Sequence, residues 1–143
     1  MAQSNINLFN EDIDFTLENS KETVDWITNT IKSENKTLGE INFIFCSDKY
    51  LLDLNQNYLK HDTFTDVITF DYVEGTIISG DIFISIERVE ENAKNLNTPL
   101  VRELLRVMIH GVLHLTGYSD KTIEEQQEIR GKEDFYLALH REN

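Results

Sequence analysis

The sequence predicts an α+β fold, in which a small mixed β-sheet of about four strands is covered by helices around a buried central helix. Two observations lead to this class. Short β-rich runs alternate with segments of helical periodicity, and one late segment is apolar around most of a helix circumference. With 143 residues, 40% of them hydrophobic, the chain can bury one ordinary core, so we expect a single domain over residues 1–143.

The first third of the chain predicts the order strand, helix, strand, helix. Residues 6–17 alternate loosely between apolar and polar and indicate a strand, after which Ser20 offers a cap to an amphipathic helix. The run 41–46 is short, apolar and β-rich. Ser47 is then expected to cap a helix that extends to about Lys60.

The middle of the chain predicts a hairpin and a further helix. Residues 66–73 and 76–85 are β-rich runs on either side of a short turn at 74–75. Ser85 is placed to begin a helix that runs to a break near Asn97.

The last third predicts two helices, of which the first is the central one. Pro99 suits the first turn of a helix over the segment PLVRELLRVMIHGVLHLTG, whose apolar circumference predicts burial. A final helix over roughly 122–141 begins at a Thr122 cap with Glu125 three residues later, which is a capping-box arrangement.

A metal-binding motif lies at the end of the central helix. His110 and His114 are four residues apart, so their imidazoles lie one above the other on a helix. Gly117 can adopt the left-handed conformation that ends a helix, which would bring Asp120 back towards the same point. An i, i+4 histidine pair alone arises easily by chance, but the glycine and carboxylate spacing favours a metal site.

Two imidazoles and one carboxylate leave a fourth coordination position open, which is typical of hydrolytic zinc, with one Zn²⁺ ion per chain. A metallopeptidase-like hydrolase is an alternative, although zinc peptidases carry glutamate where this chain has Gly111. The same ligand types also occur in non-haem iron sites, which is a further alternative.

The formal net charge of −13 argues against broad electrostatic binding of nucleic acid, and no DNA partner is expected. A late acidic run is interpreted as a solvated face. It comprises Glu124, Glu125, Glu128, Glu133 and Asp134. Because no secretory signal or membrane span is predicted, we expect a cytoplasmic location and no membrane partner.

Three ordered segments are similar to one known family. HGVLHLTGY (110–118), LNQNYLKHDTFTDVITFDY (54–72) and GDIFIS (80–85) together resemble the YbeY-type rRNA maturation factors. The resemblance implies a zinc-dependent, single-strand-specific endoribonuclease that acts in rRNA maturation and small ribosomal subunit quality control. Its partners would be single-stranded RNA, rRNA and ribosomal small-subunit proteins, and residues 1–143 would be one metal-dependent hydrolase domain.

The resemblance also implies a ligand set, with one departure. His110 and His114 match two zinc ligands of the family, whose third ligand is usually histidine at the position of Asp120. Aspartate is an acceptable zinc ligand. Ser119 stands where the family commonly has aspartate, so the alternative is that Asp120 fills that structural role instead.

A second departure concerns the substrate. Many family members have an arginine where this chain has Leu59, and the adjacent Lys60 and His61 are candidate replacements that would contact a scissile phosphate. Arg102 and Arg106 share the helical row that leads to the histidines and are candidate substrate-binding residues, or else they pair with nearby acids.

A different class of function remains open: a ribosome-assembly binding module whose metal is structural. The missing arginine and the high acidity favour it. If it is correct, metal removal should abolish folding and the metal-loaded protein should not cleave RNA.

Overall fold

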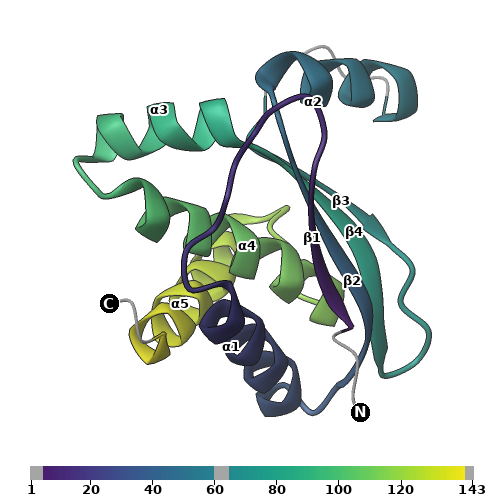
Figure 1. The fold of residues 1–143 in the computed structure, drawn as a ribbon. Helices are drawn as coiled ribbons and strands as arrows, with labels where there is room; N and C mark the ends of the chain where they lie inside the picture. Colours follow the sequence, from purple (N-terminus) through teal and green to yellow (C-terminus); the bar gives the residue numbers. More distant parts are fainter. Residues whose placement is uncertain (1–4, 60–64, 141–143) are drawn as a thin grey trace.

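The structure, a computed structural model, describes residues 5–59 and 65–140. Four strands form one mixed sheet in the order β1-β2-β4-β3 (Figure 1). Their bounds are Ile6–Asn10 (β1), Thr37–Cys46 (β2), Val67–Asp71 (β3) and Ile77–Ser85 (β4). The first, second and fourth strands are parallel, and β3 pairs with β4 as the predicted antiparallel hairpin. The predicted α+β class is confirmed.

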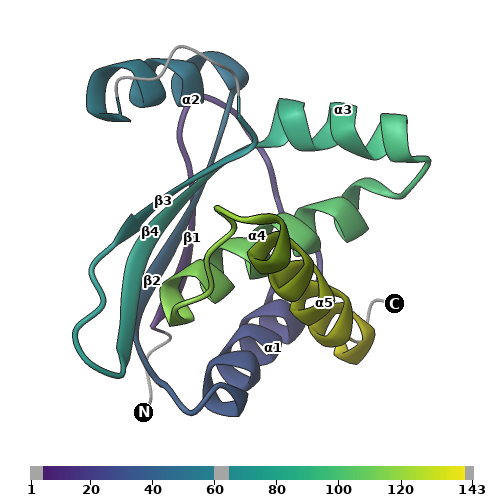
Figure 2. The same cartoon turned by 180° about the vertical axis from the view of Figure 1, so that it is seen from behind.

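Five α-helices accompany the sheet, and their bounds are Ser20–Ser33 (α1), Asp48–Leu54 (α2), Ile86–Leu96 (α3), Leu100–Thr116 (α4) and Ile123–Leu139 (α5). A π-helical segment, Asn55–Leu59, continues α2. Figures 1 and 2 show α1, α4 and α5 on one side of the sheet. Leu51 of α2 belongs instead to a second cluster with Cys46 and Ile68. Alternate residues of the strands therefore serve two packing layers.

The central helix α4 packs closely on β4. Ten of its residues are buried, as its apolar circumference predicts. Gly111 permits this close packing, because a Cβ atom there would lie 3.0 Å from the Cδ1 atom of Ile82. The position that holds glutamate in zinc peptidases is thus occupied here by a helix–sheet contact.

The predicted helix boundaries that depend on local hydrogen bonds are confirmed. Ser47 and Ser85 accept from backbone N–H groups in the first turns of α2 and α3, each at 3.1 Å. Thr122 and Glu125 form the complete capping box of α5. Gly117 ends α4 in the left-handed conformation, with φ 118°.

The prediction of a strand over residues 6–17 is wrong beyond Asn10. The amide of Glu11 still donates to a carbonyl oxygen of β2, but the chain then leaves the sheet. The alternation continues because this loop packs on the core, where the rings of Phe15 and Phe45 are 5.1 Å apart. Burial without ladder hydrogen bonds produced the strand-like pattern.

Three other boundaries differ from the prediction. The second strand begins at Thr37 rather than at residue 41, because it pairs with β4 on the N-terminal side of an irregularity in the ladder. Ser20 is the first residue of α1 and not its cap, since Asn19 holds that position with positive φ and no capping side-chain bond. Pro99 is the N-cap of α4 rather than part of its first turn.

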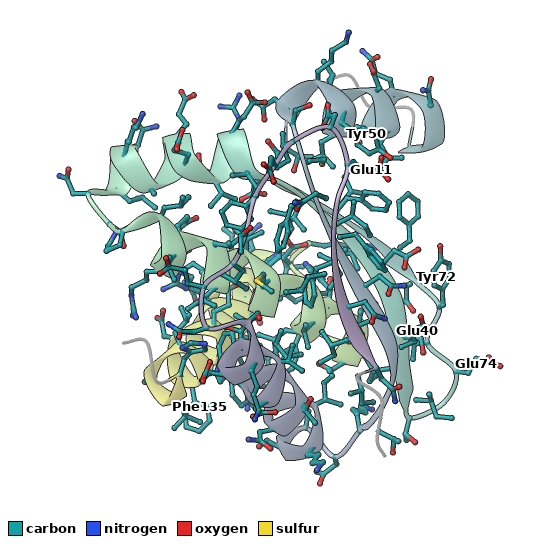
Figure 3. The ribbon with its side chains drawn as sticks, viewed as in Figure 1. Glu11, Glu40, Tyr50, Tyr72, Glu74 and Phe135 are labelled. Atoms are coloured by element: carbon teal, nitrogen blue, oxygen red, sulfur yellow. The ribbon has the colours of Figure 1, made fainter. Side chains whose placement is uncertain are left out.

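The sheet and its hairpin turn also carry exposed acids, among them Glu40 and Glu74. Figure 3 shows Glu40, Tyr72 and Glu74 on the side away from α1 and α5.

Within the described ranges, no helix combines the length and apolar character needed to cross a membrane.

Candidate metal centre

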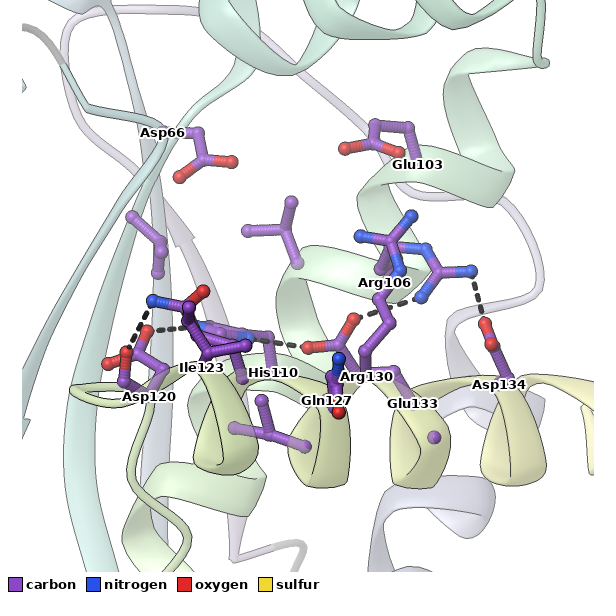
Figure 4. A pocket seen from close by; sticks show the side chains of 15 residues that line it. Asp66, Glu103, Arg106, His110, Asp120, Ile123, Gln127, Arg130, Glu133 and Asp134 are labelled. Carbon is purple, nitrogen blue, oxygen red and sulfur yellow. Dashed lines mark hydrogen bonds and ion pairs between the residues drawn. The ribbon is translucent and has the colours of Figure 1, made fainter.

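A polar stripe runs along α4, most of whose other residues are buried. Glu103, Arg106, His110 and His114 follow one another at intervals of three or four residues, so they lie on one side of the helix. The first three line a cavity of about 770 Å³ between α4, α5 and the start of β3, which we call the α5 cavity (Figure 4). Polar residues on a core helix are thus gathered where the helix faces this cavity.

The turn at Gly117 brings Asp120 to the two histidines, as the sequence predicts. The Nε2 atoms of His110 and His114 lie 3.0 Å apart. The Oδ2 atom of Asp120 lies 3.6 Å from the first and 3.4 Å from the second. Asp120, rather than Ser119, therefore faces the histidines.

Hydrogen bonds fix which nitrogen of each imidazole carries the proton. His110 donates from Nδ1 to Oε2 of Glu133 at 2.5 Å, and His114 donates from Nδ1 to the carbonyl oxygen of Tyr118 at 2.9 Å. Because a carboxylate and a carbonyl accept, each neutral ring has an unprotonated Nε2. When both rings are neutral, two lone pairs and a carboxylate oxygen face one another, an arrangement that a cation between them would stabilise.

The spacing of these three atoms fits a small divalent ion. Zinc binds imidazole nitrogen and carboxylate oxygen at about 2.0–2.2 Å, so neighbouring ligands of a tetrahedral site lie about 3.3 Å apart. The three observed separations, 3.0, 3.4 and 3.6 Å, bracket this value. His110, His114 and Asp120 are thus a group that can hold a metal ion, and we call these three residues the metal group.

Glu133 of α5 is a component of the site that the sequence interpretation missed. The interpretation of the late acidic run as a solvated face is wrong for this residue, because only 3% of it is exposed. Its Oε1 atom accepts from Nη1 of Arg106 at 2.9 Å while Oε2 accepts from His110. The available signal was its position on the buried stripe of α5, four residues after Ile129 and four before Leu137.

Glu133 and His110 each stabilise the charged form of the other. Burial raises the pKa of Glu133, but the hydrogen bonds from His110 and Arg106 outweigh it and hold the pKa below its ordinary value. Burial likewise lowers the pKa of His110, while the bond to Glu133 and the nearby carboxylates of Asp120 and Asp66 raise it above its ordinary value. The carboxylate therefore keeps His110 oriented with Nε2 towards Asp120.

The loop that carries Asp120 is held from two sides. Gln126 donates from Nε2 to the carbonyl oxygen of Asp120 at 3.0 Å, and the amide of Lys121 donates to Glu125 at 3.1 Å. On the other side, the hydroxyl of Tyr118 donates to Glu34 at the end of α1 at 2.8 Å. The ligand geometry is thus built on α4, α5 and α1 together.

A second cavity adjoins the first at the metal group. It has a volume of about 610 Å³, runs along β3, and shares Asp66, Val67, His110 and Asp120 with the α5 cavity. Asp66 reaches both cavities, and burial raises its pKa above the ordinary value. Burial also raises the pKa of Glu103. The walls beside the metal group are therefore rich in carboxylates.

The predicted substrate-binding residues do not share one position in the structure. Arg106 lines the α5 cavity, but its guanidinium is paired with Glu133 and, at 2.7 Å, with Asp134. Arg102 is exposed on α4 and is not among the residues that line either cavity. Lys60 and His61 lie outside the described residues, so their candidate roles stay predictions.

Comparisons with known proteins agree on one family. The profile described as Endoribonuclease YbeY matches residues 5–140. Endoribonuclease YbeY of Flavobacterium psychrophilum is 55% identical over 131 residues, covering 92% of this chain and 94% of that protein. Endoribonuclease YbeY of Amoebophilus asiaticus is 53% identical over 142 residues, covering 99% of this chain and 97% of that protein.

One solved structure supports the fold. The solution structure of TM1509 from Thermotoga maritima matches with a TM-score of 0.65 at 30% identity. The match covers 92% of this chain and 86% of that one. The similarity therefore extends over the sheet and helices together and not only over the histidine motif.

Proposed function

The chain belongs to the YbeY family of endoribonucleases, and from this premise we propose a zinc-dependent, single-strand-specific enzyme that acts in rRNA maturation and small ribosomal subunit quality control. Family membership makes the chain a hydrolase with RNA as its substrate. The observation that carries the proposed chemistry is the convergence of the two imidazole Nε2 atoms and one carboxylate oxygen beside a cavity.

Zinc is the ion that we propose for this group. Two nitrogen ligands and one oxygen ligand leave a coordination position for substrate or water, which is typical of hydrolytic zinc. When bound, such an ion polarises a phosphoryl oxygen and activates the nucleophile. Elemental analysis of anaerobically purified protein tests the choice, because stoichiometric iron with oxygen consumption would favour the non-haem iron alternative.

The residues of the chain then prepare the site. Glu133 and the carbonyl of Tyr118 hold the two imidazoles, and Asp120 completes the ligand group. The α5 cavity has the volume of a small-ligand site, which supports entry of unpaired nucleotides rather than a duplex. Lys60 and His61 remain the proposed phosphate contacts.

The test of this function is RNA cleavage by the metal-loaded protein. Wild-type protein and His114→Ala are incubated with labelled single-stranded RNA and with the same RNA paired to its complement. We expect cleavage of the single strand by the wild type only. Equal cleavage by His114→Ala would assign the activity to a contaminant or to another site.

If the protein were instead a binding module with a structural metal, removal of the metal should abolish folding. The main core packs residues of the sheet, α1, α4 and α5 without any of the three ligands, which supports a fold that persists when the metal is removed. We therefore propose that chelated protein keeps its helical circular dichroism signal and loses cleavage. Ribosomal small-subunit proteins as partners and a cytoplasmic location stay predictions.

A further inference from the structure

One side of α5 faces the cavity beside the metal group, and we propose that it binds the RNA strand next to the scissile bond, with Arg130 contacting a phosphate. Eight residues of α5 line the cavity, and four of them, Ile123, Gln127, Arg130 and Gly131, are spaced to lie on one side of the helix and form what we call its cavity face. The inference rests on the proposed endoribonuclease function. It assigns substrate binding to a helix that the sequence interpretation did not connect with RNA.

Arg130 is the cation of the α5 cavity that is available to a ligand. The other arginine in its lining, Arg106, is held by Glu133 and Asp134. Within the described residues, Arg130 is exposed and makes no hydrogen bond or ion pair, although it interacts electrostatically with Glu103 of the same cavity. Figure 4 shows its side chain in the cavity together with Arg106 and Glu103. A guanidinium in this position can donate two parallel hydrogen bonds to a phosphate.

Gly131 is an independent indication that a ligand approaches this face. It lies in the interior of α5, where glycine is the least favourable residue apart from proline. No packing contact explains it, because a Cβ atom at this position would meet no atom within 4 Å. A helix wall without a side chain lets a ligand backbone come close, which is a common use of glycine at binding sites.

The metal end of the same face suits a base. Ile123 is 72% exposed, the largest exposure among the large hydrophobic residues of the described chain, and it lines the cavity beside Asp120. The amide of Gln127 lies one turn further along the helix. An apolar contact, an amide and a guanidinium in succession match the base, base edge and phosphate of a nucleotide.

Arg130→Ala tests the phosphate contact. We expect KM for a single-stranded RNA to rise about 10-fold with kcat changed less than about 3-fold, because the contact is made in the ground state and the transition state. The dependence of log(kcat/KM) on log salt concentration should become shallower by about 0.7, the value for one phosphate contact on a single strand. Arg130→Lys should recover part of both effects. Lys94→Ala, which removes an exposed cation of α3, is the matched control and should change neither.

Gly131→Ala tests the close approach with opposite effects on stability and activity. We expect the midpoint of thermal unfolding to rise by about 3 °C, because alanine favours the helix. We expect kcat/KM to fall about 10-fold, because the added methyl group displaces the strand from the metal group. Ala138→Gly, on α5 but outside the cavity lining, should lower the unfolding midpoint and leave kcat/KM unchanged.

The outcomes separate this inference from the proposed function. If wild-type protein does not cleave RNA, the proposed function is overturned and the inference with it. If the wild type cleaves RNA while Arg130→Ala keeps the KM and salt dependence of Lys94→Ala, the phosphate contact is overturned. Unchanged kcat/KM in Gly131→Ala would overturn the close approach at α5.

Discussion

Replacing Glu133 should weaken metal binding although this residue is not a proposed ligand. Its carboxylate accepts from Nδ1 of His110 at 2.5 Å and from Arg106 at 2.9 Å, and the side chain is almost fully buried. Glu133→Gln keeps an acceptor for His110 but removes the charge that favours a proton on Nδ1. Glu133→Ala removes both hydrogen bonds and lets the imidazole rotate away from His114.

Loss of such a hydrogen-bond partner costs about 10- to 100-fold in metal affinity, or about 1.4–2.7 kcal/mol. We expect Glu133→Gln near the lower value and Glu133→Ala near the upper one, measured by competition with a chromophoric zinc chelator. Asp134→Asn is the matched control, because Asp134 contacts Arg106 but neither histidine, and its zinc affinity should stay within about 2-fold of the wild type. Wild-type affinity in Glu133→Ala would refute the idea that this carboxylate positions His110.

Three further predictions concern stability. Gly111→Ala should lower the free energy of unfolding by about 1–3 kcal/mol, because the added methyl group overpacks against Ile82. In a double-mutant cycle measured by urea unfolding, Ile82→Val should restore part of this loss. Additive effects of the two substitutions would exclude that contact. Thr122→Ala should cost about 1 kcal/mol in the same assay because it removes the α5 cap, and an unchanged midpoint would contradict this. Burial raises the pKa of Cys46 from an ordinary value of 9.0 to about 12, so the folded state retains a proton that the unfolded chain releases. Stability should therefore fall as pH rises from about 9 to 12, and Cys46→Ala should flatten that decline; an equally steep decline in this variant would rule out the thiol as its cause.

Fold features set by local chemistry could be predicted from the sequence. Ser47, Ser85 and Thr122 act within one helical turn, so the residues that form each cap are close together in the sequence. The end of the first strand could not be predicted in this way. Asp12, just after the end of β1, accepts from the backbone and hydroxyl of Ser47, which lies 35 residues later. A contact of this range leaves no periodic pattern in the sequence.

The candidate metal site shows the same difference between contacts that are near and contacts that are distant in the sequence. His110, His114 and Asp120 lie within eleven residues, and helix geometry together with one glycine turn is enough to bring them together. Glu133 is 23 residues from His110 and reaches it only because α5 packs beside α4. Arg106 shows that a correct position on a helix does not predict the partners of a side chain. Its helical row was predicted, but its pairing with two acids of α5 depends on tertiary structure.

The net charge of −13 describes the whole surface and does not decide what the cavity binds. Of the acids in the α5 cavity, Glu133 and Asp134 are paired with Arg106, and Asp120 faces the two histidines. Burial raises the pKa of Asp66 and of Glu103, which favours their neutral forms. A divalent cation in the ligand group would add two positive charges beside these residues. The acidic exterior therefore argues against non-specific binding along the protein surface, while binding inside the cavity depends on the local balance between the ion, Arg130 and the remaining carboxylates.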